Sequence, residues 1–122
     1  MASQDLIDFD EYISKQGFFD FLSDIDVDTV LDQRDDAPFD DLWMEAFHRV
    51  DTAGISDENS KFIDSLREKS FKNSLRASED SEIAGRVCDD IELIAKTLLS
   101  GEKGAWPVAY LWDSYKNGIF PS

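Results

Sequence analysis

The clearest pattern in the chain is a repeat of hydrophobic positions at intervals of three and four residues, which predicts amphipathic α-helices. The repeat is strongest from Ser81 to Gly101. One face of a helix over this segment gathers the apolar side chains of Ile83, Ala84, Val87, Ile91, Ile94, Ala95, Leu98 and Leu99. Gly101 follows the last apolar position and predicts the end of the helix.

Three further segments show the same spacing. The segment from Pro38 to Ala53 has Pro38 in its first turn and Gly54 after its end. Its apolar positions are Phe39, Leu42, Trp43, Ala46, Phe47 and Val50. Ser56 is expected to cap a helix reaching Ala77, with an apolar side of Phe62, Ile63, Leu66, Phe71 and Leu75 that is broad enough to allow a bend. A last helix follows Pro107, with Val108, Leu111, Trp112 and Tyr115 on one face and Gly118 as its stop.

The first 37 residues have a weaker pattern. A short helix is predicted from Asp8 to Gln16, closed by Gly17, and a further helical turn from Phe18 to Ser23. From Asp24 to Asp28 acidic and apolar residues alternate, which favours an extended segment. The boundary between helix and extended chain stays open at this point.

These elements predict an all-α fold, a compact single-domain bundle of five or six helices. A chain of 122 residues with 42% hydrophobic content can bury one sizeable core. Internal repeats and low-complexity linkers are absent from the sequence. We expect one domain over residues 1–122, in which an acidic N-terminal segment (1–37) packs on a helical core (38–121).

Charge changes this picture, because the sequence has 27 acidic residues against 12 Lys and Arg and a net charge of −15. Residues 1–58 hold 17 of the acids and only three bases, Lys15, Arg34 and Arg49, so −14 of the charge lies there. Nucleic acid and anionic membranes would be repelled, and neither is expected as a direct partner. A basic protein partner is favoured instead.

An aspartate series in the first half is the leading candidate for that contact. On a continuous helix Asp20, Asp24 and Asp28 would lie one above another, and on a strand Asp24, Asp26 and Asp28 would share a face. Stacked like charges destabilise a helix, and a cationic partner would relieve them. A repulsive, solvated face is the alternative. The predicted partner-binding residues are Asp20, Asp24, Asp28, Asp32, Asp35, Asp36 and Trp106.

Trp106 joins this set because it stands between Gly104 and Pro107 in a predicted loop. Trp112 has helical spacing and is expected in the core. Aromatic side chains outside the core are frequent anchors of protein interfaces.

Metal and cofactor binding are not expected. Asp24, Asp26, Asp28, Leu31 and Asp35 match positions of a calcium loop, but the sixth position is Thr29 in place of Gly, and the twelfth is Asp35 in place of Glu. Glu45 and His48 have the spacing of a di-iron pair. His48 is the single histidine, so a cluster of several histidines cannot form within one chain.

Catalytic residues are not predicted either, and we expect a protein that is not an enzyme. The pairs Asp35-Asp36, Asp40-Asp41 and Asp89-Asp90 are interpreted as solvated helix ends and faces. The sequence contains no Gly-rich phosphate loop, nucleophile elbow or Cys-Xaa-Xaa-Cys pair. The single cysteine, Cys88, lies among apolar residues and is interpreted as a buried thiol. Met1 to Asp5 lacks the basic start of a secretory signal, so a cytoplasmic location is expected.

Several stretches resemble small helical immunity proteins of bacterial toxin systems, with contact-dependent growth inhibition as the nearest type. They are Leu42-Trp43-Met44-Glu45-Ala46-Phe47, Phe62-Ile63, Leu66-Arg67, Asp89-Asp90-Ile91-Glu92-Leu93-Ile94 and Tyr115-Lys116-Asn117-Gly118-Ile119-Phe120-Pro121. The resemblance covers residues 38–121 and is one of general style. It implies a cytoplasmic protein that binds and blocks one cognate toxin, commonly a nuclease.

The acidic charge of the sequence agrees with this resemblance, because a toxin that acts on RNA or DNA needs a positive surface that an acidic protein can cover. The predicted function is therefore an immunity protein (antitoxin) that neutralises a basic toxin by stoichiometric binding. The alternative is an acidic nucleic-acid mimic that inhibits another DNA- or RNA-binding complex, for example in phage evasion of host defence. A metal-responsive regulator and an enzyme are the remaining classes.

Overall fold

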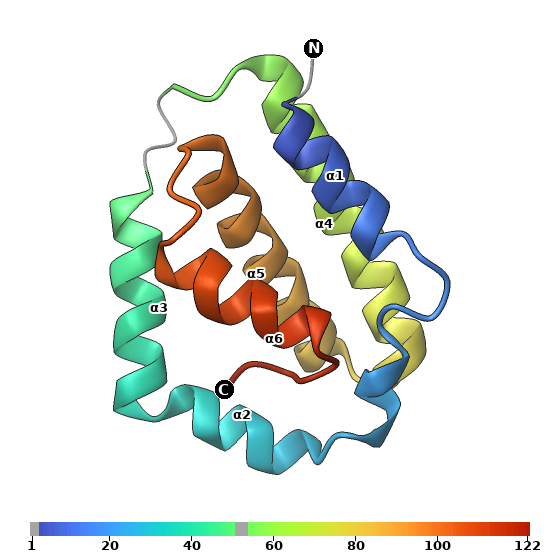
Figure 1. Cartoon of the computed structure of the whole chain (residues 1–122). Coiled ribbons are helices and arrows are strands. Elements are labelled where there is room, and N and C mark those ends of the chain that lie inside the picture. Colours follow the sequence, from blue (N-terminus) through green and yellow to red (C-terminus); the bar gives the residue numbers. More distant parts are fainter. Residues whose placement is uncertain (1–2, 51–53) are drawn as a thin grey trace.

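The computed structural model describes residues 3–50 and 54–122, which fold into a helical bundle with no strand in those ranges (Figure 1). The all-α prediction is confirmed. In chain order the elements are α1 (Gln4–Ile13), η1 (Asp20–Asp24), α2 (Val27–Asp35), α3 (Ala37–Arg49), α4 (Asp57–Ser78), α5 (Ser81–Leu99), η2 (Pro107–Trp112) and α6 (Asp113–Lys116).

Helix α5 is the centre of the bundle. Helix α4 packs along it, and α1 and η2 cover other parts of its surface. Ile83, Val87, Ile91 and Ile94 are completely buried, as their spacing predicts. Because three separate elements contact α5, its apolar stripe forms the centre of the core.

The ends of α4 and α5 follow the expected capping chemistry. The hydroxyl of Ser56 accepts a hydrogen bond of 3.2 Å from the backbone N–H of Asn59, which confirms the predicted cap. Asp80, the residue before α5, caps this helix. Its carboxylate accepts hydrogen bonds from the backbone N–H groups of Glu82 and Ile83. These bonds satisfy donors that a helix start leaves without a partner.

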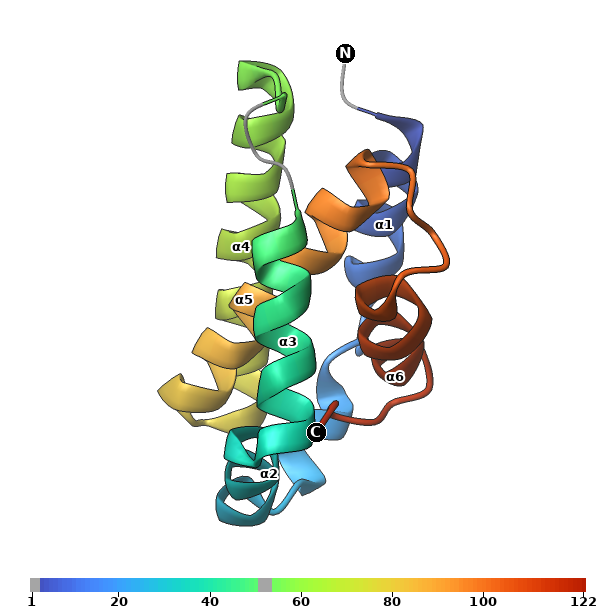
Figure 2. The same cartoon turned by 90° about the vertical axis from the view of Figure 1, so that its left-hand side faces the viewer.

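Helix α3 departs from its prediction. It covers Ala37–Arg49, Val50 is extended, and the remainder of the predicted helix, residues 51–53, lies outside the described residues. Leu42 and Phe47 were expected in the core, but both are exposed. The reason is the position of α3 at one side of the bundle in Figure 1, so that its outer face is turned to the viewer in Figure 2, and its main neighbour is α2.

The C-terminal segment is also more irregular than predicted. In place of one α-helix after Pro107, the π-helical segment η2 is followed by the short helix α6. Gly118 has a φ of +70°, a left-handed conformation that suits glycine and ends the helix as predicted. Trp112 and Tyr115 are buried, which confirms their assignment to the core.

In the N-terminal region, α1 begins at Gln4 and ends at Ile13, earlier than the predicted Asp8–Gln16. Gly17 has a φ of +80° and closes the turn that follows. Next comes the 3₁₀ helix η1, and the extended chain is confined to Ile25 and Asp26 before α2 begins.

A buried charge pair attaches α2 to the rest of the bundle. Asp90 was interpreted as part of a solvated helix face, but its side chain is completely buried, while Asp89 is exposed. The two terminal nitrogens of Arg34 donate to the two oxygens of Asp90, both at 2.8 Å. Burial alone would lower the pKa of Arg34, but the Asp90 carboxylate outweighs it and the pKa is raised.

Two aromatic side chains complete this buried network. The indole nitrogen of Trp43 donates to Asp90 at 2.9 Å, and the Tyr115 hydroxyl donates to it at 2.6 Å. Burial, followed by the charge of Asp90, holds the pKa of Tyr115 well above its ordinary value. Arg34 also donates to the carbonyl oxygen of Pro121 at 3.1 Å, so α2, α3, α5, α6 and the C-terminal residues after α6 meet at one point.

Candidate partner-binding surface

The six predicted acidic contact residues are all exposed. Asp20 and Asp24 stand at the two ends of η1. Asp28, Asp32 and Asp35 lie on α2, and Asp36 links α2 to α3. We call these six residues the acidic surface. They occupy consecutive elements, which run along one edge of the bundle in Figure 1.

The local geometry of this surface differs from both predicted forms. Asp20, Asp24 and Asp28 do not stack on one continuous helix, because the chain is extended at Ile25. A strand is not formed either. Asp26 caps α2, since its carboxylate accepts from the backbone N–H of Thr29 at 3.3 Å. The like-charge stacking that the sequence suggested is instead found on α2 itself, where the three exposed aspartates follow helical spacing.

Internal ion pairs neutralise little of the acidic surface. Asp35 lies 3.5 Å from the guanidinium of Arg86. Within residues 3–50 and 54–122, Asp28 and Asp32 form no ion pair. Acids outside this surface are better compensated, because Asp5 pairs with Lys103 and Asp10 with Lys69. The carboxylates of Asp28 and Asp32 on α2 are therefore available to an external cation.

Trp106 lies at the start of the last helical segment, and the prediction that it stands in a loop is wrong. Its ring is half-buried, stacks on Tyr110 at 5.4 Å between centroids, and meets Phe39 edge to face. These rings, with Leu42 and Asp36, line a groove of about 570 Å³. The structure thus brings Asp36 of the acidic surface and Trp106 to one site.

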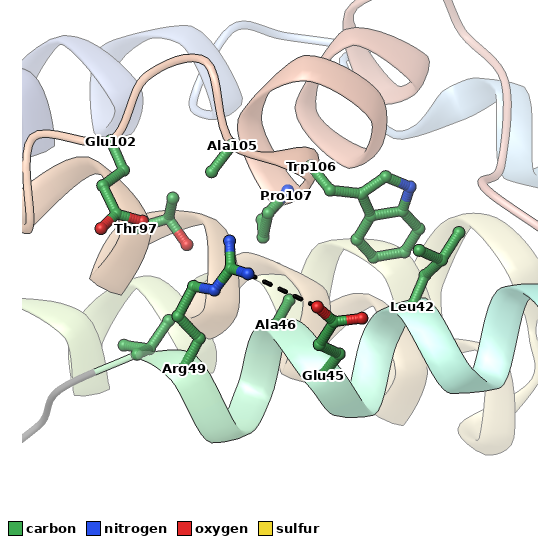
Figure 3. Close-up of a pocket in the computed structure, with 10 residues that line it drawn as sticks. Leu42, Glu45, Ala46, Arg49, Thr97, Glu102, Ala105, Trp106 and Pro107 are labelled. Atoms are coloured by element: carbon green, nitrogen blue, oxygen red, sulfur yellow. Dashed lines mark hydrogen bonds and ion pairs between the residues drawn. The ribbon is translucent and has the colours of Figure 1, made fainter.

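A second hollow continues along α3 on the other side of Leu42 and Trp106. It is small, about 70 Å³, and lies between α3 and the segment after α5. Figure 3 shows Leu42, Glu45 and Arg49 of α3 facing Glu102 and Trp106 across it. The Glu45 carboxylate and Arg49 guanidinium are 3.4 Å apart. We call the two hollows together the α3–η2 groove.

Two residues of this groove were missed in the sequence. Leu42 was assigned to the core because of its spacing, and Tyr110 was not assigned at all. A signal existed for Tyr110, since it lies four residues after Trp106 and would share a helical face with it. No pattern in the sequence indicates that α3 leaves Leu42 uncovered.

A comparison with protein-family models identifies the chain. The model described as "Immunity protein PIM1" matches residues 8–122, nearly the whole sequence. The chain belongs to the PIM1 family of immunity proteins. No curated protein matches the sequence.

This membership gives the groove and the acidic surface a context, because an immunity protein acts by binding a cognate toxin. The resemblance to immunity proteins is confirmed at the level of the family. The contact-dependent type, the nature of the toxin and the residues that bind it stay predictions.

The remaining candidate residues from the sequence concern metal binding and the cysteine thiol. Residues 27–35 of the calcium-loop match form helix α2 and not a loop. Among the described residues, no group of three or more His, Cys, Asp and Glu side chains is arranged to hold a metal ion. His48 is exposed on α3 beside Phe47. Cys88 is buried, and burial raises the pKa of its thiol.

Across the described ranges, no helix has the length and apolar character needed to cross a bilayer.

Proposed function

We propose that this immunity protein neutralises one cognate toxin by stoichiometric binding, that the toxin is a nuclease acting in the cytoplasm, and that the acidic surface contacts its cationic face. Membership of the family supports the inhibitory role over an enzymatic one. The nuclease target and the contact residues rest on the charge argument.

The observation that carries the proposal is the exposure of the six carboxylates on η1, α2 and the α2–α3 link. They belong to the half of the sequence that holds −14 of the net charge of −15. A nuclease needs a positive surface to hold the phosphates of its substrate. An acidic protein with little internal neutralisation complements such a surface and is steered towards it.

The proposal is tested with the toxin domain encoded beside the gene of this chain, because an immunity gene has to be inherited with its toxin gene. Induction of that domain should stop growth, and co-expression of the immunity protein should restore growth. Light scattering after size-exclusion chromatography should show a complex of one toxin domain and one immunity protein. The purified domain should cleave RNA or DNA, and an equimolar amount of the immunity protein should stop the cleavage.

Three results would contradict the proposal or part of it. A toxin domain that arrests growth but leaves labelled RNA and DNA intact would contradict the nuclease assignment. An immunity protein that shifts the mobility of labelled RNA or DNA at physiological salt would contradict neutralisation by toxin binding. It could then protect the nucleic acid by binding it directly. Growth arrest that continues despite equal expression of both proteins would remove the neutralising function itself.

A further inference from the structure

The α3–η2 groove has an apolar floor, and large apolar side chains in it stay exposed to solvent, where a helical bundle would normally bury them. Leu42 is 44% exposed and Tyr110 is 40% exposed, although both face a groove already lined by Phe39 and Trp106. Neighbouring apolar side chains that stay exposed in a folded protein often mark a place where another molecule binds. The stacked Trp106 and Tyr110 rings offer a flat, rigid surface of the type found at interface anchors.

Trp106 and Tyr110 lie four residues apart on the last helical segment, so their rings share one of its faces. Trp106 begins the segment and Tyr110 lies in the π-helical stretch η2, which replaces the α-helix that Pro107 was expected to start. Insertions of π-helical backbone occur frequently at functional sites, because they reposition side chains at a local cost in stability. The Tyr110 hydroxyl is fixed by a 2.9 Å bond to the carbonyl oxygen of Ser122.

The rim of the groove is acidic. Asp36 borders its wide part, and Glu45 and Glu102 border its narrow part. Arg49 is the single cation among the residues that line the two hollows, and it is already paired with Glu45. A ligand that fills the groove therefore meets apolar side chains at the centre and carboxylates at the edge. The acidic rim therefore favours an occupant that carries positive charge.

We propose that the α3–η2 groove receives a segment of the toxin in which an apolar side chain is flanked by Lys or Arg. The apolar side chain packs between Leu42 and the Trp106–Tyr110 pair, and the cations reach Asp36 and Glu102. This inference rests on the proposed function and adds a second contact beside the acidic surface. A second copy of this chain is disfavoured as occupant, because two surfaces with the same acidic rim would repel each other.

A matched pair of substitutions on α3 tests the groove. Leu42→Ser removes an exposed apolar side chain from the floor of the groove, and Met44→Ser removes one of similar exposure, 39%, from another side of the same helix. Both residues are already exposed, so both variants should fold, which circular dichroism and the melting temperature check. Leu42→Ser should weaken binding of the toxin domain roughly 30-fold, as expected for an interface anchor. Met44→Ser should change binding less than about threefold.

Photo-cross-linking identifies the occupant without relying on stability. p-Benzoylphenylalanine placed at position 110 should cross-link to the toxin domain, and the linked peptide should contain an apolar residue with Lys or Arg within a few positions. The same probe at position 44 should give little cross-linking. A linked peptide without basic residues, or self-linking of the immunity protein in place of the toxin, overturns the proposal.

The two levels of failure are distinguishable. If the wild-type protein does not bind the toxin domain at all, the proposed function fails and this inference fails with it. If the wild-type protein binds, but Leu42→Ser and Met44→Ser bind equally well and position 110 gives no cross-link, the groove proposal alone is overturned.

Discussion

Arg34 and Asp90 meet across 56 residues of sequence and form a two-pronged ion pair with both contacts at 2.8 Å. Each oxygen of Asp90 accepts a second hydrogen bond, one from Trp43 and one from Tyr115. The guanidinium also lies over the rings of Phe39 and Phe120. Since three of the six residues of the acidic surface lie on α2, this pair fixes the orientation of those predicted binding residues relative to the core.

The first prediction is that breaking this pair severely destabilises the fold. Arg34→Ala and Asp90→Ala each leave a buried charge without its partner, which costs about 3 to 5 kcal/mol. The free energy of unfolding from urea denaturation, followed by far-ultraviolet circular dichroism, measures this loss. That loss is a large fraction of the roughly 5 to 15 kcal/mol that stabilises a typical domain.

The control for this prediction is Arg86→Ala, which removes the partly exposed partner of the exposed Asp35. Its cost should stay within about 1 kcal/mol, because exposed ion pairs contribute little. The combined variant Arg34→Met with Asp90→Leu should be less destabilised than the sum of the two alanine variants, because neither buried charge is left alone. Equal losses for Arg34→Ala and Arg86→Ala would contradict the structural role of the pair.

The buried network shows why part of the fold escapes a reading of hydrophobic positions. Asp90 lies three residues after Val87 and four before Ile94, so its spacing places it on the buried stripe of α5. Arg34 follows Leu31 in the same way on α2. A charged residue on an apolar face is a signal for a buried partner, but each residue alone gives no indication of which distant segment supplies that partner.

Helices α4 and α5 could be predicted closely because the spacing of both, the Ser56 cap of α4 and the Gly101 stop of α5 agree with the structure. Helix α3 shows the limit of such reasoning, because six apolar positions at helical spacing predict burial on all of them. Burial depends on the neighbours that the tertiary fold supplies, and α3 lies at one side of the bundle in Figure 1. Leu42 and the groove beside it could therefore be found only in the structure.

The second prediction concerns the cap of the central helix. Asp80→Ala removes the acceptor for the N–H groups of Glu82 and Ile83, and should lower the free energy of unfolding by about 1 kcal/mol. Asp80→Asn keeps an acceptor oxygen at the same place and should restore most of that stability. Thermal denaturation of the three proteins side by side is sufficient. Equal melting temperatures for the alanine and asparagine variants would argue against the cap.

The third prediction is a loss of stability at high pH that depends on Tyr115. Its pKa in the folded protein is raised well above the ordinary value, whereas in the unfolded chain it is near 10. The folded state therefore binds the proton more tightly. The stabilisation is complete below about pH 10 and is lost as the pH rises towards the folded pKa, since the unfolded chain then releases its proton first.

The matched variant is Tyr115→Phe, which lacks the titrating hydroxyl and the bond to Asp90. At neutral pH this variant should be less stable by about 1.5 to 3 kcal/mol, the usual contribution of a hydrogen bond to a charged group. The difference between the two proteins should be constant up to about pH 10 and should narrow at higher pH. Urea denaturation at pH 7, 9, 10.5 and 11.5 measures this difference. A difference in stability that stays constant up to pH 11.5 would show that Tyr115 is not responsible for the loss at high pH.

The last prediction tests the acidic surface against a charge of the same kind elsewhere. Asp32 and Asp64 are both exposed aspartates inside helices, Asp32 on α2 and Asp64 on α4. Asp32→Lys and Asp64→Lys change the net charge by the same amount, so any difference between them comes from position. If α2 faces the toxin, Asp32→Lys should slow association with the toxin domain about tenfold at low salt and reduce the dependence of the rate on salt. Asp64→Lys should alter the rate much less, through the overall charge alone.

Stopped-flow measurements at several salt concentrations separate the cases, because screening suppresses the effect of both substitutions at high salt. If both variants slow association equally, net charge and not the acidic surface steers the toxin, and the α3–η2 groove would then be the better candidate for the specific contact.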